Sequence, residues 1–87
     1  MTRGLVEIVI DAIRHLATLK LIPSDLASRP LAGSTGLDEL GIDSLGKLEL
    51  LTEIEERADV TLSEGLLQGL CTLEDLARAV ARVKARP

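Results

Sequence analysis

The chain has 87 residues, of which 46% are hydrophobic and none is Phe, Tyr or Trp. This length suits one domain, residues 1–87, with one small aliphatic core. A formal charge of −4 and the lack of aromatic rings argue against nucleic acid and membrane surfaces as partners, because both are negatively charged and single strands bind by stacking on rings.

The first predicted element is an amphipathic helix from Leu5 to Leu21. Its apolar residues recur at spacings of three and four, which places them on one face. Thr2 is the candidate N-cap and Pro23 marks the stop. No signal peptide and no apolar run of about 20 residues is visible, and the single cysteine, Cys71, is expected to be a small buried residue. These features predict a cytoplasmic protein.

A long loop is predicted from residue 23 to about residue 42. Prolines and glycines recur through it and break any helical period. Loops of this length usually carry function or short structure of their own. Four leucines are expected to pin this loop to the core: Leu26, Leu31, Leu37 and Leu40.

A second helix is predicted from Ser44 to Ala58, with Asp43 as its N-cap. Its buried stripe is expected to consist of Leu45, Leu48, Leu51, Ile54 and Ala58. A short helical segment around residues 66–70 follows, and Thr72 with Asp75 resembles a capping box that opens the last helix. Because no strand pattern persists, the predicted fold is all-α, with three longer helices and one short helix.

Acidic residues are concentrated around the second helix. Residues 38–64 contain nine acidic and two basic side chains, a net charge of −7, so the rest of the chain carries +3. Four of these acids gather on the helix: Glu49, Glu53, Glu55 and Glu56. Taken alone, such a cluster is usually a solvated surface.

The string Leu-Gly-Ile-Asp-Ser-Leu, residues 40–45, connects the long loop to the start of the second helix. Ser44 is expected in the first helical turn, where unpaired backbone N–H groups favour an anion attached to or bound near its hydroxyl. Ser44 is therefore a candidate phosphate-bearing residue. As an isolated tripeptide, however, Asp-Ser-Leu is more simply explained by helix capping.

The wider pattern resembles the acyl carrier protein family. The order of a first amphipathic helix, a long loop, the Asp-Ser-Leu helix, a short helix and a final Thr-Leu-Glu-Asp-Leu helix covers nearly the whole chain. The resemblance implies an acyl-carrier-like four-helix bundle with a long loop between helices 1 and 2. It also implies that Ser44, flanked by Asp43 and Leu45, carries a 4′-phosphopantetheine arm derived from coenzyme A.

The resemblance implies partners as well. A phosphopantetheinyl transferase would attach the arm, and acyl-loading, condensing or acyl-transfer enzymes of fatty-acid or polyketide-type biosynthesis would use the thioester on it. These enzymes are expected to recognise the acidic second helix through Glu49, Glu53, Glu55 and Glu56, together with an exposed apolar edge at Leu50 and Leu62. The chain itself is expected to be a monomer without catalytic or metal-binding residues.

Three positions depart from the usual family pattern. Gly46 and Lys47 replace polar or acidic residues, and Ala58 replaces a larger side chain. Lys47 argues against a purely electrostatic partner interface at the start of the helix. Ala58 predicts room for an acyl chain near Leu62 and Leu66.

Two other classes share parts of this pattern. A stand-alone aminoacyl or peptidyl carrier of a nonribosomal pathway would have a similar motif, and an unmodified acidic helical interaction module would have similar charges. A catalytic triad through His15, the single histidine, is disfavoured because its helical setting favours a structural role. One histidine and one cysteine supply no metal-ligand cluster.

Overall fold

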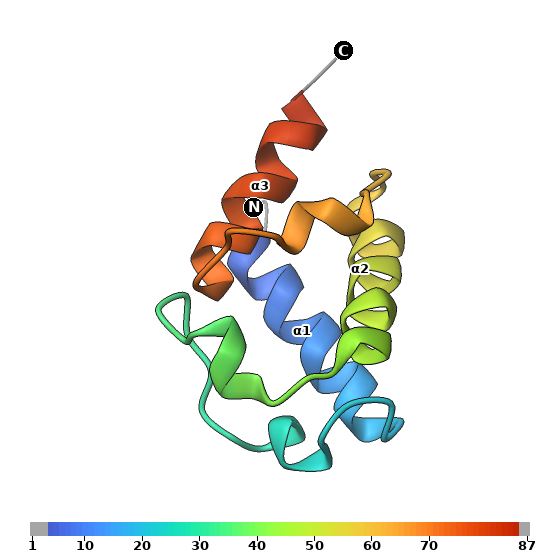
Figure 1. Cartoon of the computed structure of the whole chain (residues 1–87), viewed down its shortest axis with the longest axis vertical. Coiled ribbons are helices and arrows are strands. Elements are labelled where there is room, and N and C mark those ends of the chain that lie inside the picture. Colours follow the sequence, from blue (N-terminus) through green and yellow to red (C-terminus); the bar gives the residue numbers. More distant parts are fainter. Residues whose placement is uncertain (1–3, 86–87) are drawn as a thin grey trace.

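The computed structural model describes residues 4–85, which form three α-helices connected by loops (Figure 1). The α-helices are α1 (Leu5–Thr18), α2 (Ser44–Ala58) and α3 (Leu73–Ala85). The loops contain three short 3-10 turns, namely η1 (Ser24–Ala27), η2 (Leu37–Leu40) and η3 (Glu64–Leu67). No strand occurs in this part of the chain, where Gly36 and Thr72 form one isolated bridge. The all-α prediction is confirmed.

The short helix expected between α2 and α3 is a single 3-10 turn, η3, of four residues. Glycines at positions 65 and 69 weaken helix formation there, and Gly69 adopts a left-handed φ of 79°. The predicted count of four helices is therefore not confirmed, and the fold is all-helical with three α-helices.

Helix α1 begins after Gly4, whose carbonyl accepts hydrogen bonds from the Glu7 and Ile8 N–H groups at 3.1 and 3.2 Å. The predicted cap, Thr2, lies outside the described residues. The helix ends at Thr18 rather than Leu21, because Lys20 adopts the left-handed conformation with φ 63° and turns the chain.

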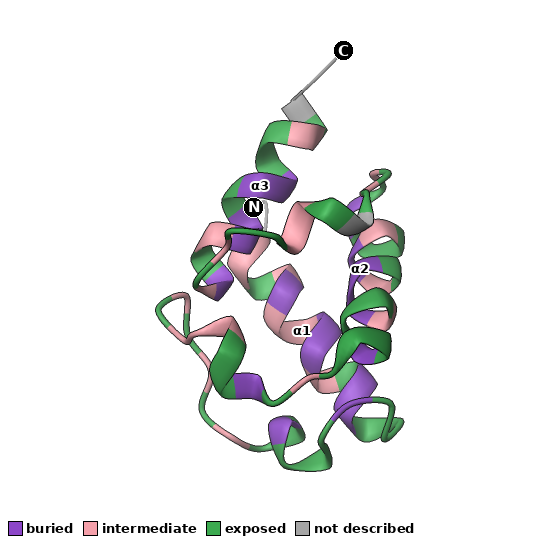
Figure 2. Cartoon of the chain, viewed as in Figure 1, coloured by how far each residue is buried: buried purple, intermediate pink, exposed green. Residues whose placement is uncertain are grey.

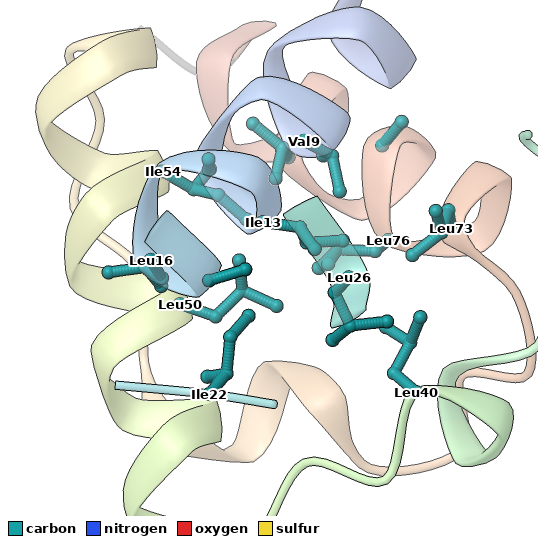
Figure 3. Close-up of a cluster of buried hydrophobic side chains, with 14 of the residues drawn as sticks. Val9, Ile13, Leu16, Ile22, Leu26, Leu40, Leu50, Ile54, Leu73 and Leu76 are labelled. Carbon is teal, nitrogen blue, oxygen red and sulfur yellow. The ribbon is translucent and has the colours of Figure 1, made fainter. Parts of the chain in front are cut away.

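An aliphatic core fills the space between the three α-helices and the long loop (Figures 2 and 3). Its largest fully buried side chains come from the three α-helices and from η1: Val9, Ile13, Leu26, Leu50, Ile54, Leu73, Leu76 and Val80. The loop leucines behave as predicted. Leu26 and Leu40 are 0% and 2% exposed, and Leu31 and Leu37 pack partly buried against the core.

The long loop is also held by hydrogen bonds at both of its ends. One guanidinium nitrogen of Arg14 in α1 donates to the carbonyls of Leu26, Ala27 and Arg29 at 3.3, 3.0 and 3.2 Å. Farther along, loop carbonyls at residues 35 and 33 accept from the first amides of α3, those of residues 73 and 74, at 3.0 and 2.8 Å. Side-chain hydrogen bonds from α1 therefore hold one end of the loop, and the other end of the loop caps the start of α3.

Helix α3 begins with the predicted capping box. The Asp75 N–H donates to the Thr72 hydroxyl at 3.1 Å, and the Asp75 carboxylate accepts from the N–H groups of Cys71 and Thr72 at 3.1 and 3.2 Å. These backbone hydrogen bonds, that of Cys71 first, lower the pKa of the Asp75 carboxyl below its ordinary value. The Cys71 side chain itself is exposed, which corrects the expectation of a buried residue.

The buried face of α2 differs from the predicted stripe. Gly46, Leu50, Leu51, Ile54 and Ala58 are buried, whereas Leu45 and Leu48 are 67% and 40% exposed. Steps of three residues fall short of a helical turn by about 60°, so the Leu45–Leu48–Leu51 series winds from solvent into the core. The expected exposed edge at Leu50 is wrong, because Leu50 is 1% exposed and lies among Leu16 and Ile22 (Figure 3).

Candidate functional site

Ser44 is the first residue of α2 and is exposed. The helix is capped by its neighbour Asp43, whose Oδ1 accepts a hydrogen bond from the Gly46 N–H at 2.7 Å. The Asp43 carbonyl accepts from the Lys47 N–H at 2.9 Å. Within residues 4–85 the Ser44 hydroxyl makes no hydrogen bond, so it is available for reaction.

Two glycines shape the approach to Ser44. Gly41 has φ 67° and turns the chain out of η2 in a conformation that other residues adopt only with strain. Gly46 lies in the first turn of α2, where an added Cβ would meet the Ile42 Cγ2 methyl at 2.6 Å. The missing side chain lets Ile42 pack under the start of the helix that carries Ser44.

An open groove of about 320 Å³ runs beside Ser44. Leu48, Leu51 and Leu67 supply its apolar walls, and Lys47 and Gln68 supply polar groups. A smaller space of about 50 Å³ adjoins it, shares Lys47 and Leu67, and reaches Leu50 and other core residues. The Ser44 hydroxyl is therefore next to a surface that an extended, partly apolar group can follow.

The first turn of α2 is electrostatically suited to an anion. It contains no acidic residue, and Lys47 lies three positions after Ser44 on the same side of the helix. Lys47 is exposed and forms no ion pair with any carboxylate in the described part of the chain. Both the lysine and the helix dipole therefore favour a negative group on Ser44.

The four acids of α2 have different surroundings. Glu53 pairs with Arg57 at 2.7 Å, and the Glu55 carboxylate accepts from the Leu62 N–H at 2.7 Å. Across residues 4–85, Glu49 and Glu56 make no such contact. Glu55 thus fastens the loop after α2, and Glu49 and Glu56 keep their full hydrogen-bonding capacity for a partner.

Sequence reasoning named Leu45 as a neighbour of Ser44, but it wrongly placed both Leu45 and Leu48 in the buried stripe of the helix. Leu45 and Leu48 are exposed on the first two turns of α2, and the candidate Leu62 is half-buried against the core. The position of Gly46 could have indicated the correct buried face. Residues four apart lie on the same face of a helix, so a buried Gly46 places Leu50 and Ile54 on the buried face as well. Leu45 and Leu48 then lie on the exposed side. Ala58 is 3% exposed, far along the helix from the groove beside Ser44.

In the described part of the chain, neither the single histidine nor a metal-ligand cluster lies at Ser44. His15 is exposed on α1, where it has no hydrogen bond to Ser44. Among the residues that the structure describes, no group of three His, Cys, Asp or Glu side chains can hold a metal ion. In the same residues, no helix combines the length and the apolar character needed to cross a bilayer.

Comparison with known proteins identifies the family of the chain. Residues 18–80 match the family model described as the phosphopantetheine attachment site. The chain belongs to the acyl carrier protein family. It is 31% identical over 80 residues to an acyl carrier protein of Streptomyces coelicolor, covering 91% of this chain and 85% of that protein. It is 34% identical over 65 residues to an acyl carrier protein of Phytoplasma australiense, covering 74% and 86%.

No solved structure matches the chain at comparable strength. Family membership nevertheless fixes two points. Acyl carrier proteins are carriers rather than enzymes, and the group that this domain type carries is phosphopantetheine.

Proposed function

We propose that residues 1–87 form one carrier domain that holds acyl intermediates as thioesters on a 4′-phosphopantetheine arm attached to Ser44. In this proposal a phosphopantetheinyl transferase attaches the arm, and acyl-loading, condensing or acyl-transfer enzymes of fatty-acid or polyketide-type biosynthesis use it. The supporting observation is the exposed, unbonded Ser44 hydroxyl at the start of α2, inside the segment that matches the attachment-site family.

The residues around Ser44 fit a phosphodiester with an amide-containing arm. When attached, the arm supplies a terminal thiol that carries the acyl group as a thioester. Lys47 and the first-turn N–H groups would favour the phosphodiester charge. The Leu48, Leu51 and Leu67 walls of the groove would contact the apolar part of the arm, and Gln68 offers hydrogen bonds to its amides.

Partner recognition is proposed to use α2. Glu49 and Glu56 are the acids best placed to meet basic groups of a partner, because Glu53 and Glu55 already contact Arg57 and the Leu62 N–H. Leu45 and Leu48 replace Leu50 as the apolar part of this surface, because they are exposed and lie on the same helix as Ser44.

Intact mass spectrometry tests the proposal. Incubation with coenzyme A and a phosphopantetheinyl transferase of broad specificity should add the mass of one arm to the whole population. An unchanged mass, with a known carrier modified in the same tube, would support the unmodified interaction module instead. Loading of the arm with acyl or aminoacyl groups by matched synthetases then separates the acyl carrier from a nonribosomal aminoacyl carrier.

A further inference from the structure

The large apolar side chains that the described residues expose are gathered at one end of the molecule. They are Leu19, Leu21, Leu45 and Leu48, with 54%, 48%, 67% and 40% of their surface exposed. Leu45 and Leu48 belong to α2 and accompany Ser44. Leu19 and Leu21 belong to the chain that leaves α1, and nothing in the function proposed so far uses them. We call residues 19–21 the α1 lip.

The α1 lip borders the start of α2. Lys20, Leu21 and Ile22 line a hollow of about 390 Å³ whose other side includes Gly41 and Asp43. The contact is close, since a Cβ at Gly46 would meet the Ile22 Cγ2 methyl at 3.0 Å. Figure 1 shows the end of α1 and the following loop beside the first turn of α2. Ser44 therefore lies between the groove along α2 and the hollow at the α1 lip.

Hydrogen bonds hold the α1 lip in one conformation. The Lys20 N–H donates to the Ala17 carbonyl and the Leu21 N–H to the Leu16 carbonyl, both at 3.0 Å, with Lys20 at φ 63°. This is a Schellman motif, in which an apolar contact between Leu21 and Leu16 is expected. The motif gives no reason for the exposure of Leu21 and Leu19, which are 48% and 54% exposed.

We propose that the α1 lip is a second docking surface for the phosphopantetheinyl transferase that attaches the arm, and this rests on the proposed attachment at Ser44. The transferase must place its active site over Ser44 and cover the surface around it. The matching surface is an apolar rim of that active site with a carboxylate opposite Lys20. Because the lip is already ordered, docking on it costs little conformational entropy.

The charges on the α1 lip and on α2 favour a single orientation of the partner. Lys20 on the lip is basic, whereas Glu49 and Glu56 on α2 are acidic. A transferase with an acidic group at one edge of its active site and basic groups at the other meets both only in one orientation, which directs Ser44 into the active site. Interfaces of such transient complexes are small, so a few exposed leucines form a substantial part of them.

The test measures kcat/KM for arm attachment by the broad-specificity transferase. A Leu19→Ser/Leu21→Ser double variant should lose about tenfold, which corresponds to about 1.4 kcal/mol. Leu19→Ser alone and Lys20→Glu should each lose about threefold. Arg82→Ser, an exposed change on α3, is the matched control and should keep the original rate. Thermal melts of every variant report folding.

The outcomes separate this inference from the attachment itself. If the unaltered protein gains no mass, the proposed function fails. If it gains the arm, but the lip variants react at the original rate and amide signals of residues 19–22 stay unmoved on titration with the transferase, the lip is not a docking surface. Co-sedimentation of the unaltered protein with phosphatidylglycerol vesicles, abolished by the double variant, would also overturn the inference and assign the lip to lipid.

Discussion

A Cβ atom at Gly46 would lie 2.6 Å from the Cγ2 methyl of Ile42, closer than such contacts occur in proteins. The pair joins the residue before the Asp43 cap to the first turn of α2. Ile42 is partly buried against the core, so it has little room to retreat. The small residue at position 46 is therefore what allows the large one at position 42, and together they fix the start of the helix at Ser44.

The first prediction is that Gly46→Ala destabilises the domain. In an open helical position this change would stabilise by about 1 kcal/mol, because alanine is the better helix former. Here overpacking against Ile42 should reverse the sign and cost about 1 to 3 kcal/mol. Urea unfolding measures the difference. In the Ile42→Ala background Gly46→Ala should cost less, and an equal cost in both backgrounds would show that the two residues do not interact.

The second prediction concerns the dependence of stability on pH. The pKa of Asp75 is lowered in the folded state by hydrogen bonds from the Cys71 and Thr72 N–H groups. Its contribution to stability is therefore complete above the unfolded pKa of about 3.9 and is lost as the pH falls through the lower folded value. Between pH 5 and pH 2 the unaltered protein should lose more stability than Asp75→Asn. Identical pH profiles would contradict the capping role of the carboxylate.

The third prediction separates the acids of α2. Glu55→Ala removes the acceptor of the Leu62 N–H and should cost about 1 to 3 kcal/mol of stability. Glu49→Lys and Glu56→Lys should leave the melting temperature nearly unchanged but slow arm attachment and acyl loading, with a smaller difference at high salt, where screening shortens to a few ångströms. If both variant proteins react at the original rate with each enzyme tested, the acidic residues of α2 form only a solvated surface.

The fourth prediction concerns Lys47. A phosphodiester on Ser44 should interact with Lys47 and with the positive end of α2, a contribution of about 0.3 to 1 kcal/mol. The modified protein should therefore melt higher than the unmodified one, by roughly 1 to 8 °C for a domain of this size. Lys47→Glu should remove most of this rise, whereas Arg82→Glu on α3 should preserve it. A rise that is equal in all three proteins would exclude Lys47 from the interaction.

The parts of the fold that local rules specify could be predicted from the sequence. The Thr72–Asp75 capping box and the Asp43 cap follow from residue types at fixed spacing, and the structure contains both sets of hydrogen bonds. The loop leucines were predictable because a long loop on the surface needs apolar side chains to attach it to the core. Ser44 was singled out by the same local reasoning, together with the family resemblance of its motif.

The sequence-based predictions fail at positions where tertiary contacts determine which side chains are buried and where a helix ends. Leu48 and Leu50 are both compatible with an amphipathic pattern, and only packing against α1 buries Leu50 and exposes Leu48. A left-handed Lys20 ended α1 three residues early, which residue propensity does not favour. Cys71 is exposed, and its contact with the capping box is made by its backbone N–H, which donates to the Asp75 carboxylate.

The most direct test of attachment at Ser44 is the intact mass of serine variants after incubation with coenzyme A and the transferase. Ser44→Ala should retain its fold, because the Ser44 side chain makes no hydrogen bond in the described structure, and should gain no mass. Ser24→Ala and Ser63→Ala, matched changes at other exposed serines, should each gain one full arm. A full gain on Ser44→Ala would contradict the account and move the attachment to another residue.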